Sequence, residues 1–271
     1  MIEGRELALA NLTVLDAPPP GVVEAAAAAG FDSVTLRLAG GGTGDPNPLI
    51  GDTPTRRETI ARLEHHGLGV LDVEVVRMRE DTDAALLRPL FESAVALGAR
   101  YVLVISQDAD EARSAEGFAA ICAEAETFGL RAVLEFMVFT ATKSVEQADR
   151  IVARAAHPAA GVLVDPLHLR RSGGSPADVA PLVAAHPDRY PYLQLCDAPL
   201  AMPDGGGRGL YEEAVVNRFA TGDGELPLAE LLAAMPSVPV SVETPVAAIA
   251  HLTPVERAQH AIAATRRLLE G

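Results

Sequence analysis

Four segments in the second half of the chain have the composition of β-strands, and each ends at a side chain that can bind a metal through oxygen. The four side chains are Glu135, Asp165, Gln194 and Glu243. They are 30, 29 and 49 residues apart, so the first two intervals each fit one strand and one helix, and the third fits a unit with a long loop. Oxygen donors form sites for hard divalent cations. The sequence therefore predicts a metal site made of these four residues.

A simpler interpretation of each residue is also open, because polar residues often follow strands as helix N-caps. Glu135 and Glu243 fit that interpretation poorly, since each lies in an apolar run where an unpaired carboxylate would be costly. Asp165 and Gln194, taken singly, fit either interpretation. The metal site is favoured because all four residues end successive strands.

His168 follows Asp165 by three residues and is expected at the same end of the strands. The six other histidines lie in or beside predicted helices. His168 is therefore the histidine expected to take part in chemistry, and a loop histidine without a role is the alternative.

Three arginines are candidates for binding a polar or anionic substrate. Arg171 belongs to an Arg-Arg-Ser-Gly-Gly segment just after His168, Arg218 precedes a Gly-Asp-Gly-Glu segment, and Arg77 lies near Glu74 at the end of a predicted strand. An ordinary turn or loop is the alternative in each case. No nucleotide-binding glycine motif, nucleophile elbow or zinc-type cysteine cluster is present in the sequence.

The chain alternates short β-branched runs with longer alanine- and leucine-rich runs, and a glycine repeatedly separates the end of a helix from the next strand. This pattern predicts an α/β fold, a single (β/α)8 TIM barrel in which residues 1–271 form one domain. An open doubly wound sheet is the alternative. Long loops at 40–52 and 203–224 are expected to cover the mouth. The predicted strands are 7–11, 33–37, 69–76, 101–105, 132–136, 161–164, 192–195 and 238–242. The predicted helices are 21–29, 55–66, 84–97, 115–128, 144–155, 176–185, 227–235 and 254–269.

Net charge limits the possible partners. The 271 residues include 37 acids and 22 bases, a formal charge of −15, which argues against binding nucleic acid or an anionic membrane surface. Two separated cysteines, Cys122 and Cys196, predict no disulfide framework. No signal-like or membrane-spanning segment is evident, so a cytoplasmic protein acting on a small molecule is expected, with a homo-oligomer possible.

The combined pattern resembles the xylose isomerase-like TIM barrel superfamily, which contains the sugar phosphate isomerases and epimerases. The resemblance covers almost the whole chain. It depends on Glu135, on Asp165-x-x-His168, on Gln194 before an Asp-Ala-Pro turn, on the Arg218-x-x-x-Gly-Asp-Gly-Glu loop, and on Glu243. It implies that Glu135, Asp165, Gln194 and Glu243 bind a divalent metal. It also implies that Glu135, His168 and Glu243 act in catalysis.

The chemistry implied by this resemblance is removal of a proton next to a carbonyl of a keto-sugar or keto-polyol, by an isomerase or epimerase that uses Mn²⁺ or Mg²⁺. Most epimerases of the superfamily carry histidine where this chain has Gln194. A Glu/Asp/Gln/Glu set is similar to that of one branch of 3-dehydroshikimate dehydratases. A metal-dependent lyase that dehydrates a cyclic hydroxy-ketone acid is therefore the alternative, and an accessory protein without catalysis is a weaker one.

Overall fold

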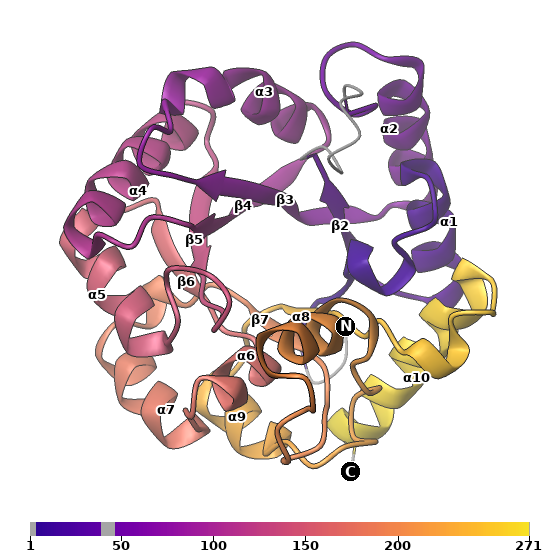
Figure 1. Ribbon diagram of the computed structural model, residues 1–271. Helices are drawn as coiled ribbons and strands as arrows, with labels where there is room; N and C mark the ends of the chain where they lie inside the picture. Colours follow the sequence, from indigo (N-terminus) through magenta and orange to yellow (C-terminus); the bar gives the residue numbers. More distant parts are fainter. Residues whose placement is uncertain (1–3, 39–46, 271) are drawn as a thin grey trace.

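The computed structural model describes residues 4–38 and 47–270, and in them eight parallel strands form a barrel surrounded by helices (Figure 1). Neighbouring strands pair in the order β6-β5-β4-β3-β2-β1-β8-β7. A parallel β-bridge between Val164 and Leu193 joins the two ends of that order and closes the barrel. The backbone N–H of Gln194 donates there to the Val164 carbonyl at 3.0 Å. The strands are β1 (Leu7–Leu9), β2 (Ser33–Arg37), β3 (Gly69–Met78), β4 (Ala99–Ser106), β5 (Arg131–Glu135), β6 (Ala160–Leu163), β7 (Leu193–Leu195) and β8 (Val240–Val242).

The fold is thus the predicted (β/α)8 barrel, and the predicted helices are present with shifts of a few residues at their ends. That residues 1–271 form one domain stays a prediction. No helix in the described ranges combines the length and the apolar run needed to cross a bilayer. The α-helices are α1 (Pro19–Ala29), α2 (Pro54–His66), α3 (Arg88–Ala96), α4 (Glu111–Glu126), α5 (Val145–Ala155), α6 (Pro166–Arg171), α7 (Pro176–Ala185), α8 (Gly206–Val216), α9 (Leu228–Ala234) and α10 (Pro254–Glu270).

The glycines that separate helices from strands have the backbone conformation that the sequence pattern predicts. Gly30, Gly67, Gly98 and Gly129 all have positive φ angles, between 64° and 85°. Only glycine adopts this left-handed conformation without steric cost, and it turns the chain from the helix back toward the barrel. This turn precedes β2, β3, β4 and β5, and because all eight strands pair in parallel, their carboxyl ends lie at one mouth.

The strands are buried on both faces, which explains their continuous apolar runs. Val102 and Val104 of β4 belong to the large cluster that packs under the helices, whereas Leu103 and Ile105 belong to a second cluster. This second cluster includes residues from β1, β3, β5 and β6 and lies inside the barrel. The barrel interior is therefore filled below the mouth, and the polar site lies above an apolar floor.

Two helices lie where the sequence predicts only loops. Helix α6 follows β6 at once and contains His168. Helix α8 lies within the expected loop 203–224 and packs beside α6 (Figure 1). Its first turn is glycine-rich, which lowers helix propensity, so packing over the barrel decides its structure. Residues 40–46 of the other expected loop lie outside the described ranges.

Candidate metal centre and active site

The four predicted metal ligands lie at the carboxyl ends of β5, β6, β7 and β8 and are almost completely buried. Glu135 is 6% exposed, Asp165 0%, Gln194 2% and Glu243 4%. Candidate ligand atoms of Glu135, Asp165 and His168 lie within 4.8 Å of one another. Gln194 Nε2 donates to Glu243 Oε1 at 3.3 Å. The fold thus gathers residues more than 100 positions apart into one polar cluster.

Asp165 is both a helix N-cap and a candidate metal ligand. It is the N-cap of α6, and its Oδ1 accepts a hydrogen bond from the His168 backbone N–H at 3.0 Å. Its Oδ2 accepts from Arg218 at 2.5 Å. The cap fixes the carboxylate at the mouth and, one turn later, presents His168 beside it.

The cluster has features that suit a cation. Gln194 Oε1 is a buried acceptor without a hydrogen-bond partner in the described part of the chain. An unpaired buried acceptor costs free energy that a bound cation would recover. Burial raises the pKa of Glu135 well above its usual value, and the charges of Glu243 and Asp165 raise it further. Glu135 and Asp165 have ligand atoms within 4.8 Å of each other, and Glu243 shares Arg218 with Asp165 and bonds Gln194. Together these side chains form a suitable site for a divalent cation.

The carboxylates of Glu243 and Asp165 have different electrostatic surroundings. Burial raises the pKa of Glu243 to about 7, although Arg218 opposes this effect. Burial also acts to raise the pKa of Asp165, but the positive charge of Arg218 and the interactions with His168 outweigh it, so this pKa is lowered. Asp165 is therefore the carboxylate that stays ionised, and Glu243 is the one that can exchange a proton near neutral pH.

His168 is a neutral imidazole in a fixed orientation. Burial is the main cause that lowers its pKa to about 4. Its Nε2 lies 3.7 Å from Glu135 Oε1, and the Phe139 ring packs edge-on against it with centroids 5.7 Å apart. A neutral imidazole can accept a proton or orient a hydroxyl group, so both roles expected of His168 are chemically available.

A cavity of about 540 Å³ opens above this cluster, at the carboxyl ends of the strands. Its lining includes the acids Glu135 and Glu243, the base His168, and a wall of apolar residues. The predicted substrate-binding residue Arg77 also lines it, and its guanidinium has no ion-pair or hydrogen-bond partner among the described residues. Arg77 is therefore free to meet a substrate.

The other two predicted substrate-binding arginines are bound to the protein. Arg171 donates to both carboxylate oxygens of Glu213, at 2.6 and 2.7 Å, and to the Pro199 carbonyl. It does not line the mouth cavity and instead fixes α8 against α6. Arg218 does line the cavity, but its guanidinium lies between Asp165 and Glu243. Direct substrate binding by these two residues stays a prediction.

Arg37, one of five arginines that the sequence offers for a substrate carboxylate in the lyase alternative, also lines the cavity. Its NH2 lies 3.5 Å from Glu74 Oε1, and its buried Nε has no partner in the described residues. Its position at the end of β2, next to Glu74 and Arg77 at the end of β3, was the available signal.

Asp197 is a second residue whose role emerges only from the structure. Its carboxylate accepts hydrogen bonds from the backbone N–H groups of Gly222, Gly224 and Leu226. A Cβ on Gly224 would lie 2.7 Å from Ala198 backbone atoms, so this close approach requires glycine. Asp197 thereby fixes the loop that begins at Arg218, which explains the Asp-Ala-Pro and Gly-Asp-Gly segments of the sequence.

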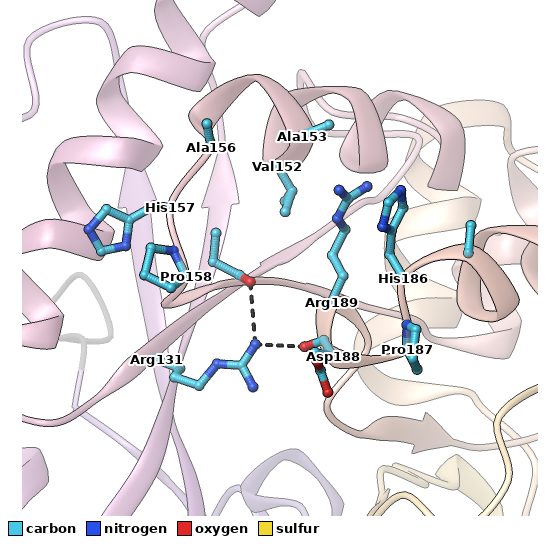
Figure 2. A pocket seen from close by; sticks show the side chains of 12 residues that line it. Arg131, Val152, Ala153, Ala156, His157, Pro158, His186, Pro187, Asp188 and Arg189 are labelled. Atoms are coloured by element: carbon cyan, nitrogen blue, oxygen red, sulfur yellow. Dashed lines mark hydrogen bonds between the residues drawn. The ribbon is translucent and has the colours of Figure 1, made fainter.

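A second cavity, of about 370 Å³, lies at the opposite end of the barrel, beside the amino ends of β5 and β6 (Figure 2). Arg131 donates there to the backbone carbonyls of Ala160 and Asp188, as the dashed lines show. The carboxyl-terminal ends of α5 and α7 border this cavity, where cationic side chains stabilise the helix dipole. None of the predicted site residues lies in this cavity.

Comparison with known proteins places this geometry in context. A family model described as xylose isomerase-like TIM barrel matches residues 23–268. No curated protein sequence matches the chain. An IolI protein solved with a zinc atom superposes with a TM-score of 0.79 at 19% identity, over 98% of each chain. D-allulose 3-epimerase from Methylomonas sp., solved with D-allulose, superposes with a TM-score of 0.70 at 15% identity, over 97% of this chain and 96% of its own.

One further solved structure is much longer than this chain. It is a xylose isomerase-like TIM barrel/4-hydroxyphenylpyruvate dioxygenase fusion protein, with a TM-score of 0.77 at 22% identity. The match covers 97% of this chain but 44% of the fusion protein, so this chain spans less than half of that protein. At these identities the superpositions show a shared fold.

Proposed function

Because the chain belongs to the xylose isomerase-like TIM barrel family, we propose that it is a divalent-metal-dependent isomerase or epimerase of a keto-sugar or keto-polyol. The observation that carries the proposal is the close approach of Glu135, Asp165 and a neutral His168, with Glu243 joined to Asp165 through Arg218. Beside Glu243 lies a buried Gln194 oxygen that has no partner among the described residues. A cluster of buried acids with perturbed pKa values, at the carboxyl-terminal mouth of a barrel, is typical of an active site.

Glu135, Asp165, Gln194 and Glu243 would hold the cation. Bound there, it would polarise the substrate carbonyl and stabilise the negative charge that proton removal leaves on the oxygen. Oxygen-only ligands favour Mg²⁺ or Mn²⁺, and the amide in place of an imidazole strengthens that preference. The zinc atom belongs to the solved IolI protein.

The protein's own residues supply proton transfer. Glu135 and Glu243 enter the cavity from strands that are separated by β6 and β7, and so approach a substrate from different sides of the barrel. Removal of a proton by one group as a carboxylate, and delivery of a second proton to the opposite face by the other group as a carboxylic acid, would invert a carbon centre, which is epimerisation. Return of the proton to the neighbouring carbon would give isomerisation. His168 would orient a hydroxyl group or accept its proton, held in place by Phe139.

A second candidate is the lyase that dehydrates a cyclic hydroxy-ketone acid such as 3-dehydroshikimate. The specific observation in its favour is that two arginines line the cavity. Among the described residues, Arg77 has unused donors and Arg37 has a buried Nε without a partner, and both line the cavity. Much of the remaining wall is apolar, including Leu103, Ile105 and Met137, which suits a carbocyclic acid better than an open-chain polyol.

The test is a small panel of compounds incubated in D₂O with protein loaded with Mn²⁺ or Mg²⁺. The panel contains ketohexoses, their phosphates, inosose, hydroxypyruvate and 3-dehydroshikimate. Deuterium uptake with recovery of an epimer or isomer supports the first function, and a new conjugated absorbance from 3-dehydroshikimate supports the second. If no compound exchanges or reacts, both functions are rejected for these substrate classes and an accessory role is favoured.

A further inference from the structure

The guanidinium of Arg218 lies between two carboxylates of the proposed metal centre. NH1 contacts Asp165 Oδ2 at 2.5 Å, and NH2 contacts Glu243 Oε2 at 2.7 Å. The Arg218 side chain is 2% exposed, and the two carboxylates are 0% and 5% exposed. This is a buried ion triad, in which the loss of one member leaves the others uncompensated.

The position of Arg218 is fixed from several directions. Its Nε donates to the Ala214 carbonyl at the end of α8 at 2.7 Å, and NH1 also donates to Cys196 Sγ at 3.3 Å. Its backbone N–H donates to the Pro245 carbonyl, just after β8, at 3.0 Å. The guanidinium therefore joins α8 and the ends of β6 and β8, and most of its donors are used by the protein.

The negative charges of the cluster can be compared with the positive charges of Arg218 and a bound cation. Glu135, Asp165 and Glu243 carry three negative charges when ionised, and Arg218 carries one positive charge. A divalent cation cancels the remaining two. Without Arg218, the same cation would leave the centre negatively charged. The nearby acid Glu74 lies outside this triad, with its Oε1 3.5 Å from the Arg37 guanidinium.

We propose that Arg218 is a built-in counter-ion of the metal centre. It holds Asp165 and Glu243 in place before a cation binds, and it lowers the affinity for that cation by charge repulsion. This inference rests on the proposed metal-dependent function, because it assumes that the carboxylates bind a cation. Arg218 is thus a positioning residue, and its effect is measurable without turnover.

The experiment compares wild type, Arg218→Gln and Arg218→Lys, each with and without Mn²⁺. Thermal unfolding and calorimetric titration give the melting temperature and the Kd for Mn²⁺. In Arg218→Gln we expect a lower melting temperature without metal and a larger rise on adding Mn²⁺ than in wild type. We also expect Mn²⁺ to bind more tightly, on the order of tenfold. Arg218→Lys keeps the charge and should show a rise close to that of wild type.

Arg171→Gln is the matched control, because Arg171 forms an equally buried pair with Glu213 away from the carboxylate cluster. It should lower the melting temperature by a similar amount with and without Mn²⁺. If wild type shows no response to Mn²⁺, the proposed metal centre fails. If wild type responds but Arg218→Gln responds equally or less, the metal centre stands and the counter-ion role is rejected.

A double variant covers the case in which Arg218→Gln does not fold. Arg218→Gln with Glu243→Gln removes the counter-ion together with one of its acids, so less charge is left uncompensated. Recovery of folding in the double variant supports charge compensation. A double variant that folds no better than Arg218→Gln alone rejects it.

Discussion

The side-chain amide of Gln194 donates to Glu243 across the pair of strands β7 and β8, with Nε2 lying 3.3 Å from Oε1. This bond orients the amide and leaves its Oε1 buried without a partner in the described ranges. A carboxylate at this position would add a fourth negative charge, and a histidine would offer nitrogen. The amide therefore gives the proposed centre an oxygen donor without adding charge.

Replacement of Gln194 tests whether this oxygen binds the cation. Gln194→Ala should weaken Mn²⁺ binding, because a ligand is lost. Gln194→His should retain a metal but shift its preference toward Zn²⁺ or Co²⁺, because imidazole is a softer donor than an amide oxygen. Calorimetry with the separate metals checks both. Unchanged affinity and selectivity in the two variants would place Gln194 outside the metal's ligands.

Removal of the metal should destabilise the protein. A cation that binds only the native state stabilises it by mass action, by about 2.7 kcal/mol at a concentration of 100 Kd. We expect chelation to lower the melting temperature by about 5–10 °C and Mn²⁺ or Mg²⁺ to restore it.

Glu135→Gln should abolish most of this metal response. The control is Asp108→Asn, which removes another buried carboxylate, paired with Arg113 instead of the cluster. It should retain the full response. An identical response in Glu135→Gln and wild type would contradict the assignment of Glu135 as a ligand.

Substitution of His168 should affect the reaction more than the metal. His168→Asn should retain Mn²⁺ affinity and lose about 10²- to 10⁴-fold in rate, the usual contribution of a general acid–base group. The measurement is the rate of whichever reaction the substrate panel reveals, together with a metal titration. A variant with full activity would leave His168 with a structural role only.

The buried neutral state of His168 also predicts a pH dependence of stability. Its pKa is lowered from 6.5 to about 4 in the native protein, so between these values the unfolded chain binds more protons. The stability that the protein gains by keeping this imidazole neutral is complete above pH 6.5. It is lost as pH falls toward 4, and the loss in the free energy of unfolding reaches roughly 3 kcal/mol. Denaturation of metal-free wild type and His168→Asn across this range should show a steeper loss in wild type. Parallel curves would mean that His168 titrates normally.

Arg77 should distinguish acidic from neutral ligands. Shikimate and its methyl ester differ at the carboxylate, and we expect the acid to stabilise the metal-loaded protein more than the ester does. Arg77→Gln should weaken shikimate binding about tenfold and remove this difference, since a charge-assisted hydrogen bond is lost. Arg79→Gln is the control, because Arg79 is exposed two residues further along and bonds Gln107. Equal binding of both compounds to wild type would favour a neutral polyol substrate.

The sequence by itself determined the barrel and the four polar residues at the ends of β5 to β8. Continuous apolar strands, and glycines at helix ends such as Gly30 and Gly67, depend on local backbone preference and burial, which a sequence pattern records directly. The carboxylates Glu135 and Glu243 were detectable because an ionised group inside an apolar run has a cost that requires an explanation.

Only the tertiary structure decided how the arginines are used. Arg77, Arg171 and Arg218 look equivalent in the sequence. In the described part of the structure, however, Arg77 lines the cavity without a partner, and the other two are paired with buried acids. Glu213 lies 42 residues from Arg171 along the chain, and Asp165 lies 53 residues from Arg218. Helix α8, whose glycine-rich start predicts a loop, supplies Glu213 and the carbonyl that binds Arg218. Ion pairing depends on distances between side chains in the folded protein, and a linear sequence contains no such distances until the barrel has closed.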